Sequence, residues 1–291
     1  MRKLLTLAIL FILFITGCSE QNGKTLHIST NSWIGYAPLF YAKEKGYLDK
    51  LNIQLLTNVS LAEAADVYDI GKADMVTTTQ HEYYSLKNSG HDIVPVILFD
   101  RSNGGDMVLS NKDLDALLKA KKIHAYLEID SINAEVLKDF LHHAGIDEKK
   151  VIFINKDQAK IESLKPKKGE NMLIVTYVPY NLELQRNGFH QLASTKDMNT
   201  IIVIDALCTN KKILQDDKAR LKQLKSVIDR SITELQADKR ASYKLVKNYL
   251  GDMSYGDYID SLQLIKWINK PSEELLKRIE PMGYKGSILI K

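Results

Sequence analysis

Short apolar runs alternate with longer segments of helical periodicity along most of the chain. The longer segments predict helices at 38–45, 60–71, 79–88 and 133–144, with another after Pro179. The short runs predict strands at 26–30, 51–56, 73–77, 93–99, 107–110, 122–127, 151–154, 172–176, 189–193 and 201–207. Strands that alternate with helices of this length predict parallel β-α-β units and therefore an α/β fold.

The last third of the chain has a different pattern. Beyond Asn210 the helical periodicity is nearly continuous. It predicts helices at 213–237, 239–250, 254–268 and 272–280, followed by a polar tail or a small hairpin. The charged residues of these segments fit solvated helix faces, so we expect their apolar faces to pack on the α/β part of the chain.

The composition is that of a folded protein of about two domains, at roughly 150 residues per domain. The 291 residues are 45% hydrophobic and 26% charged, which excludes a disordered, collagen-like or disulfide-dense chain. The 40 basic and 36 acidic residues are interspersed, so we expect no nucleic-acid partner. Because no Pro- or Ser-rich linker separates tandem domains, we expect the chain to cross between two lobes near 104–107 and 200–205.

The N-terminus carries an export signal. Two basic residues precede an apolar run at 4–15, which is shorter than the ~20 residues of a membrane-spanning helix. The run ends in small residues before Cys18, a pattern that resembles a bacterial lipobox. We therefore expect residues 1–17 to be a signal peptide, Cys18 to carry lipid, and 18–24 to form a tether. This predicts a lipid-anchored protein on the periplasmic or extracytoplasmic face of the cell envelope. The alternative is an ordinary secretory signal with a coincidental cysteine.

Nothing in the sequence points to catalysis or to a metal. Cys208 lies in a predicted buried strand, where a structural thiol is expected, and it cannot form an internal disulfide with a lipidated Cys18. His142 and His143 are adjacent on a helix and point about 100° apart, which does not suit a metal site. There is no glycine-rich phosphate loop and no nucleophile elbow. We therefore expect no enzyme, no catalytic residue, no metal and no cofactor.

The segment after the first predicted strand is the richest in candidate chemistry. Trp33, Gly35 and Tyr36 stand between this strand and the first helix. In open parallel sheets ligands bind beyond the carboxyl ends of the strands, so these residues are expected at the mouth of a site. Gly35 would let a ligand or an opposite lobe approach closely. The alternative is that both aromatic residues simply cover the edge of the lobe.

Several segments in order carry a family resemblance: 33–36 with 39–47, 70–76, 151–155 and 178–180. Together they resemble bacterial solute-binding proteins of the nitrate, sulfonate and taurine group, to which thiamine-pyrimidine-precursor binding proteins are related. The resemblance implies a two-lobed, hinged periplasmic-binding-protein fold (type II), with two mostly parallel sheets flanked by helices and two hinge crossings. Lobe I would comprise 25–105 plus 205–291, and lobe II 106–204. Such a protein, expected as a monomer, hands a small molecule to an ABC permease.

The same resemblance places candidate ligand residues at strand ends and helix starts that face the cleft. Thr79 has an equal alternative role as a helix N-cap, and Asp205 could instead pair with backbone at the hinge. The candidates are Trp33, Gly35, Tyr36, Thr78, Thr79, Asp106 and Asp205, with Ser131, Ile132, Asn133, Tyr177 and Tyr180 from lobe II.

The candidate segments contain no Arg or Lys, which anion-binding sites usually use. The aromatic residues together with Asp106 and Asp205 suit a cationic or neutral, flat ligand, although backbone N–H groups alone can bind an oxyanion. Two other functions stay open beside transport. One is a sensing lipoprotein that docks on a membrane kinase or cyclase, and the other is a scavenger or adhesion lipoprotein without a partner. Related eukaryotic pyrimidine-synthesis proteins use a cysteine-rich motif, which this chain lacks.

Overall fold

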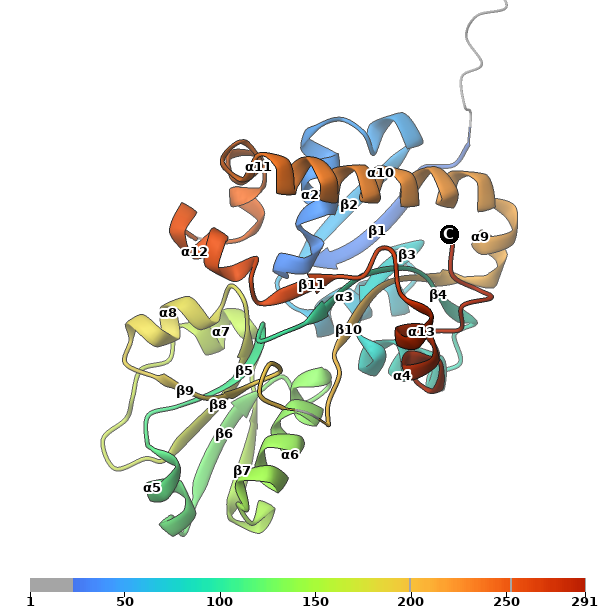
Figure 1. Ribbon diagram of the computed structural model, residues 1–291. Helices are drawn as coiled ribbons and strands as arrows, with labels where there is room; N and C mark the ends of the chain where they lie inside the picture. Colours follow the sequence, from blue (N-terminus) through green and yellow to red (C-terminus); the bar gives the residue numbers. More distant parts are fainter. Residues whose placement is uncertain (1–22, 199, 252, 291) are drawn as a thin grey trace, which may run out of the picture.

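Two β-sheets, each flanked by helices, form the protein (Figure 1). The computed structural model describes residues 23–198, 200–251 and 253–290. The predicted signal peptide, Cys18 and most of the tether lie outside the described residues. Among the residues that are described, no helix is both long enough and apolar enough to cross a membrane.

The first sheet has the strand order β11-β4-β10-β3-β1-β2. β1 pairs in parallel with β2 and β3, whereas β10 pairs antiparallel with β3 and β4, and β11 antiparallel with β4. Four of the six strands therefore run in one direction. The bounds are β1 Leu26–Asn31, β2 Ile53–Asn58, β3 Met75–Thr78, β4 Ile93–Ser102, β10 Ile204–Asn210 and β11 Ile265–Trp267.

The second sheet has the order β7-β6-β8-β5-β9, and only β5 runs against the other four strands. Its strands are β5 Asp106–Ser110, β6 Ile123–Leu127, β7 Val151–Asn155, β8 Met172–Tyr177 and β9 His190–Ser194. The chain passes from the first sheet to the second between β4 and β5, and returns between β9 and β10. This confirms the predicted fold class of two mostly parallel sheets with two crossings. We call each sheet with its helices the first and the second lobe.

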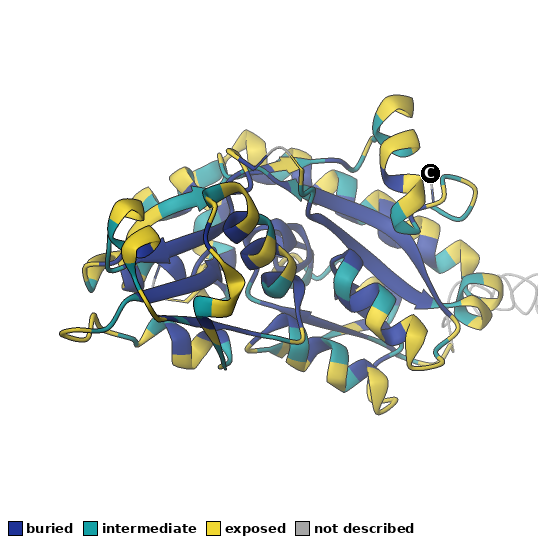
Figure 2. Ribbon diagram, turned by 90° about the horizontal axis from the view of Figure 1, so that it is seen from below, coloured by how far each residue is buried: buried dark blue, intermediate teal, exposed yellow. Residues whose placement is uncertain are grey.

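Helices cover both faces of the first sheet because its strands alternate their side chains. Ile28 and Met75 face α2 and α10, whereas Val76 and Cys208 face α3 and α4. Figure 2 shows the helices buried on the side toward the sheets and exposed on the other. The helices of the first lobe are α2 Ala37–Glu44, α3 Leu61–Asp69, α4 Gln80–Asn88, α9 Lys211–Asp216, α10 Lys218–Ala237, α11 Lys239–Val246, α12 Tyr255–Ser261 and α13 Glu273–Ile279. Those of the second lobe are α5 Leu114–Lys119, α6 Ile132–Ala144, α7 Gln158–Glu162 and α8 Asn181–Arg186.

The C-terminal third departs from the predicted pattern at two places. The helix predicted at 213–237 is divided into α9 and α10 at Asp217, whose backbone leaves the helical region at φ −110°. The helix predicted at 254–268 is wrong beyond Ser261, because residues 265–267 form β11 and pair with the end of β4. The unpaired backbone of the β4 edge requires hydrogen-bond partners, and this requirement outweighs the local helical pattern.

The two crossings between the lobes lie side by side. The Ser102 hydroxyl is 2.7 Å from the Thr195 hydroxyl, and the backbone N–H of Gly104 donates to the same Thr195 oxygen at 2.8 Å. Gly104 adopts φ +114°, a conformation that side-chain-bearing residues rarely adopt. The crossings thus form one hydrogen-bonded pair of segments beneath the space between the lobes, which is the geometry of a hinge.

Candidate functional site

A small cavity lined by buried residues lies between the two lobes. Its volume open to the centre of a water molecule is about 10 Å³, which is room for about one water. Both lobes and the returning segment contribute to its wall. The lining residues are Trp33, Leu61, Thr79, Asp106, Tyr177, Val203 and Asp205.

Trp33 fills the middle of this region. It is only 4% exposed, and its indole Nε1–H donates to Asp100 Oδ1 at 3.3 Å. Two glycines make room for this arrangement. A Cβ atom on Gly105 would lie 2.4 Å from Cη2 of Trp33, and one on Gly35 would lie 1.9 Å from Asp100 Oδ2. Trp33 is therefore seated on the hinge segment, with its polar edge directed at a buried carboxylate.

Tyr36 and Asp205 form a second buried pair. The Tyr36 hydroxyl donates to Asp205 Oδ1 at 2.6 Å. Asp205 on β10 stands directly opposite Asp100 on β4. Burial raises the pKa of Tyr36, Asp100 and Asp205 well above their usual ranges, and the proximity of the two aspartates raises the pKa of Asp205 further.

Asp106 begins β5 at the point where the chain enters the second lobe. Its side chain is 3% exposed and lines the cavity, and its Oδ2 atom has no hydrogen-bond partner among the residues that the structure describes. Burial raises the pKa of Asp106 to about 7, although the neighbouring Ser102 hydroxyl opposes the shift.

The N-terminus of α6 is bound by a carboxylate from the opposite lobe. Thr79 caps α4 in a capping box with Glu82, whose Oε2 accepts from the backbone N–H of Thr79 at 2.9 Å. The other oxygen of Glu82 accepts from the backbone N–H of Ile132 at 3.0 Å. Ser131 caps α6 through the backbone N–H of Asn133 at 3.2 Å. One carboxylate thus accepts hydrogen bonds from backbone N–H groups at the N-termini of two helices, one in each lobe.

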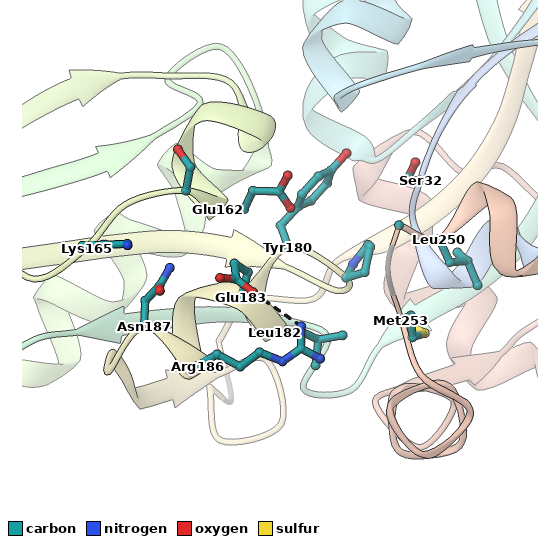
Figure 3. A pocket seen from close by; sticks show the side chains of 13 residues that line it. Ser32, Glu162, Lys165, Tyr180, Leu182, Glu183, Arg186, Asn187, Leu250 and Met253 are labelled. Atoms are coloured by element: carbon teal, nitrogen blue, oxygen red, sulfur yellow. Dashed lines mark ion pairs between the residues drawn. The ribbon is translucent and has the colours of Figure 1, made fainter.

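Two tyrosines of the second lobe reach the first lobe. The Tyr177 hydroxyl accepts from Asn31 Nδ2 at 3.3 Å, and its ring meets Trp33 edge-on at 6.0 Å between centroids. The Tyr180 hydroxyl donates to the backbone carbonyl of Val59. Figure 3 shows Tyr180 directed toward Ser32 across an open groove of about 500 Å³.

The structure brings most of the sequence-predicted site residues together. Trp33, Thr79, Asp106, Tyr177 and Asp205 line the cavity. The other candidates lie around it: Gly35 and Tyr36 behind Trp33, Ser131, Ile132 and Asn133 at the start of α6, and Tyr180 in the adjoining groove.

Thr78 is the one candidate of the described residues that is placed elsewhere. Its hydroxyl lies 3.2 Å from Cys208 Sγ. Cys208 belongs to a separate cluster under α3 and α4, where burial raises the pKa of its thiol to about 12. The thiol thus has the structural role that the sequence predicts.

Sequence reasoning missed three carboxylates that the fold directs inward. Asp100 and Glu128 each directly follow an apolar run that predicts a strand, which is a usable signal. Glu82 lies inside the helix predicted at 79–88, and no local pattern indicates that it reaches α6. Glu128 is 3% exposed, and burial raises its pKa to about 7. Within the described part of the chain, no group of three or more His, Cys, Asp or Glu side chains could hold a metal ion.

Comparison with known proteins now decides the family. Residues 33–241 match the family model described as NMT1/THI5 like. The chain belongs to the NMT1/THI5-like family. No match was found among curated protein sequences.

Solved structures of this fold match nearly the whole chain of this NMT1/THI5-like protein. The ligand-binding component of an ABC-type import system from Staphylococcus aureus, solved with zinc bound, is 13% identical, with a TM-score of 0.72 and coverage of 92% of this chain and 97% of that one. The periplasmic aliphatic sulphonate binding protein SsuA from Escherichia coli is 14% identical, with a TM-score of 0.71 and coverage of 90% and 86%. The periplasmic nitrate-binding protein NrtA from Synechocystis is 14% identical, with a TM-score of 0.66 and coverage of 82% and 70%. These similarities establish the periplasmic-binding-protein fold.

Proposed function

We propose that this protein is the solute-binding component of an ABC importer, which holds a small molecule between its lobes and delivers it to the permease. The observation that carries the proposal is the small cavity between the lobes, whose buried wall residues come from both lobes, together with the two adjacent crossings. The Staphylococcus aureus and Escherichia coli proteins of the same fold are described as import and sulphonate-binding components, which supports this function.

Binding would work through closure of the two lobes. A solute that contacts both walls binds the closed state more tightly than the open one, and it shifts the equilibrium by that difference in affinity. Direct contacts across the cleft also stabilise the closed state. Among them are the hydrogen bonds from Ile132 to Glu82 and from Asn31 to Tyr177, and a 2.8 Å pair between His81 and Glu135. Closure would present a distinct surface to the permease.

We further propose that the protein is held at the membrane surface by lipid on Cys18, after removal of residues 1–17. The segment 18–24 would serve as a tether, lobe I would comprise 25–105 plus 205–291, and lobe II would comprise 106–204. An ion pair supports this attachment, because Nζ of Lys24, the last residue of the proposed tether, lies 2.6 Å from Asp74 Oδ1.

The test is a distance measurement across the cleft in the detergent-purified full-length protein. Asp66 and Lys160 line one groove from opposite lobes, so spin labels on Asp66→Cys and Lys160→Cys report closure. Screening amines, pyrimidines, sulfonates, phosphonates and amino acids should reveal a solute that shortens the distance and raises the melting temperature. A solute that binds at saturation without shortening the distance would contradict the proposal.

A further inference from the structure

Two buried aspartates face each other across neighbouring strands. Asp100 and Asp205 are directly opposite in the antiparallel pair of β4 and β10, so their side chains leave the same face of the sheet. Asp100 is fully buried, and Asp205 is 2% exposed. Burying two like charges together is costly unless protons or an opposite charge compensate them.

Hydrogen bonds from the protein satisfy these carboxyl groups only in part. Tyr36 donates to one oxygen of Asp205 and Trp33 to one oxygen of Asp100. The remaining oxygen of Asp100 and Oδ2 of Asp106 have no hydrogen-bond partner among the described residues. No Lys, Arg or His in the described part of the chain forms an ion pair with any of the three aspartates.

The acidic side chains and the aromatic rings meet at the same cavity. Asp106 and Asp205 line it together with Trp33 and Tyr177. A cation with N–H donors satisfies unpaired carboxylate oxygens, and aromatic rings attract positive charge. We propose, on the basis of the proposed function, that the solute is a small organic cation carrying an ammonium or amidinium group, and that Asp106 and Asp205 recognise its charge.

The usual position for an anion in such a site is already taken. The N-terminus of α6 would attract a negative group, but Glu82 accepts the backbone N–H of Ile132 there at 3.0 Å. An anionic solute would have to displace this carboxylate and also lie near three aspartates. His81, the neighbour of Glu82, is paired with Glu135 and offers no free positive charge. Both facts oppose an anion and favour a cation.

The open groove at the edge of the cleft has the same sign of charge. This groove of about 860 Å³ is lined by five carboxylates, those of Glu63, Asp66, Glu128, Asp130 and Asp157, against two lysines. One of these lysines, Lys160, is neutralised by Asp157 at 2.6 Å. An acidic groove beside the cleft concentrates cations near it and repels anions.

The experiment uses solutes that share a shape and differ in charge. Guanidinium, urea and nitrate are planar and nearly equal in size, and benzamidinium, benzamide and benzoate form a larger series. Binding to the detergent-purified full-length protein is measured by calorimetry at constant ionic strength. Fluorescence of the Trp267→Phe variant gives a second readout, because Trp33 is then the only tryptophan. We expect a cation of at least one series to bind at least tenfold more tightly than its neutral and anionic counterparts.

The variant Asp106→Asn keeps the shape of the side chain and removes the carboxyl group that would ionise beside a cation. It should weaken cation binding at least tenfold without weakening binding of the neutral counterpart. Asp205→Asn is a second variant with the same expected effect. Asp216→Asn is the matched control, because Asp216 is exposed on α9 and pairs only with Lys212 among the described residues. The control should bind as the unmodified protein does.

The outcomes separate this inference from the proposed function. Tighter binding of a neutral or anionic solute, with closure of the lobes, would overturn the cation inference and leave the proposed function standing. Failure of both cations to bind at millimolar concentration would also overturn the inference. An affinity for cations that is unchanged in both aspartate variants would do the same. Cation binding without any closure would support the charge preference and contradict the transport function.

Discussion

Glu82 of α4 accepts a hydrogen bond from the backbone N–H of Ile132, the first residue of α6, across the boundary between the lobes. The same carboxylate completes the capping box of its own helix with Thr79. The Glu82 side chain therefore stabilises a helix of the first lobe and also the closed arrangement of the two lobes. It also occupies a helix N-terminus that would otherwise be available to an anion.

Glu82→Gln should loosen the closed state. Glutamine has one acceptor oxygen, so it can keep the capping box or accept from Ile132, but not both. We expect a loss of about 1–3 kcal/mol in the free energy of unfolding and a longer Asp66–Lys160 label distance. Glu63→Gln is the matched control, because Glu63 accepts from the backbone N–H of Val59 at the start of its own helix at 2.7 Å, and its carboxylate joins no helix of the second lobe by a hydrogen bond among the described residues. Equal label distances in the two variants would contradict the role of Glu82 in holding the lobes closed.

Gly105→Ala should obstruct closure. The new Cβ would lie 2.4 Å from Cη2 of Trp33, so the indole must move or the lobes must separate. We expect weaker solute binding, by about tenfold or more, and a longer distance between the labels. In Gly256→Ala the nearest atom is Ser254 Oγ at 3.7 Å, an ordinary contact, so this control should bind normally. Normal binding by Gly105→Ala would show that Trp33 is not needed in its observed place.

Trp33→Phe should lower solute affinity at least tenfold. Phenylalanine keeps an aromatic ring in the buried position but cannot donate the 3.3 Å hydrogen bond to Asp100. Because it fills most of the space, the loss of stability should stay below the ~3–5 kcal/mol expected when a buried tryptophan becomes alanine. Calorimetry and urea denaturation measure the two effects separately. Unchanged affinity would assign Trp33 to packing alone.

The pH dependence of stability should report Asp106. Its pKa is about 7 in the folded protein and about 3.9 in an unfolded chain. Between these values the folded state holds a proton that the unfolded state has released, so the free energy of unfolding falls as pH rises. The slope from this group approaches ~1.4 kcal/mol per pH unit.

Other groups add to the same trend, so the comparison must isolate Asp106. Burial also raises the pKa of Glu128, Asp100 and Asp205, and pairing with Glu135 raises the pKa of His81. Subtracting the free energy of unfolding of Asp106→Asn from that of the unmodified protein at each pH removes the contributions that both proteins share. Denaturation at pH 5 and pH 7.5 should show a smaller fall for Asp106→Asn. Parallel curves would mean that Asp106 does not titrate in this range.

Cys18→Ser should release the protein from membranes. The thiol is the proposed site of lipid attachment, and a hydroxyl cannot form the thioether bond. Fractionation of cells should place the unmodified protein with membranes and the variant in the soluble fraction. Retention of the variant with membranes would contradict the lipid anchor.

The sequence indicated some residues of the candidate site and not others. Trp33 and Asp106 were predicted from sequence because they stand beside apolar runs whose ends converge in an α/β fold, and Asp205 because its strand returns to the first lobe. Thr79 offered two roles: the structure shows that it caps α4, and its place on the cavity wall leaves its contact with a ligand as a prediction. The contact of Glu82 with Ile132 could not be predicted, because it joins residues 50 positions apart in different lobes.

The sequence by itself determined the alternation of strands and helices, the two crossings and the family, since these depend on local periodicity and on motifs in order. Only the tertiary structure decided how the charges are arranged. It turned residues 265–267 into an edge strand, turned Thr78 toward Cys208, and placed Asp100 opposite Asp205. Register and lobe packing set these distances, and they arise from contacts between residues far apart in the chain. The electrostatic character of the cleft is therefore a property of the folded arrangement.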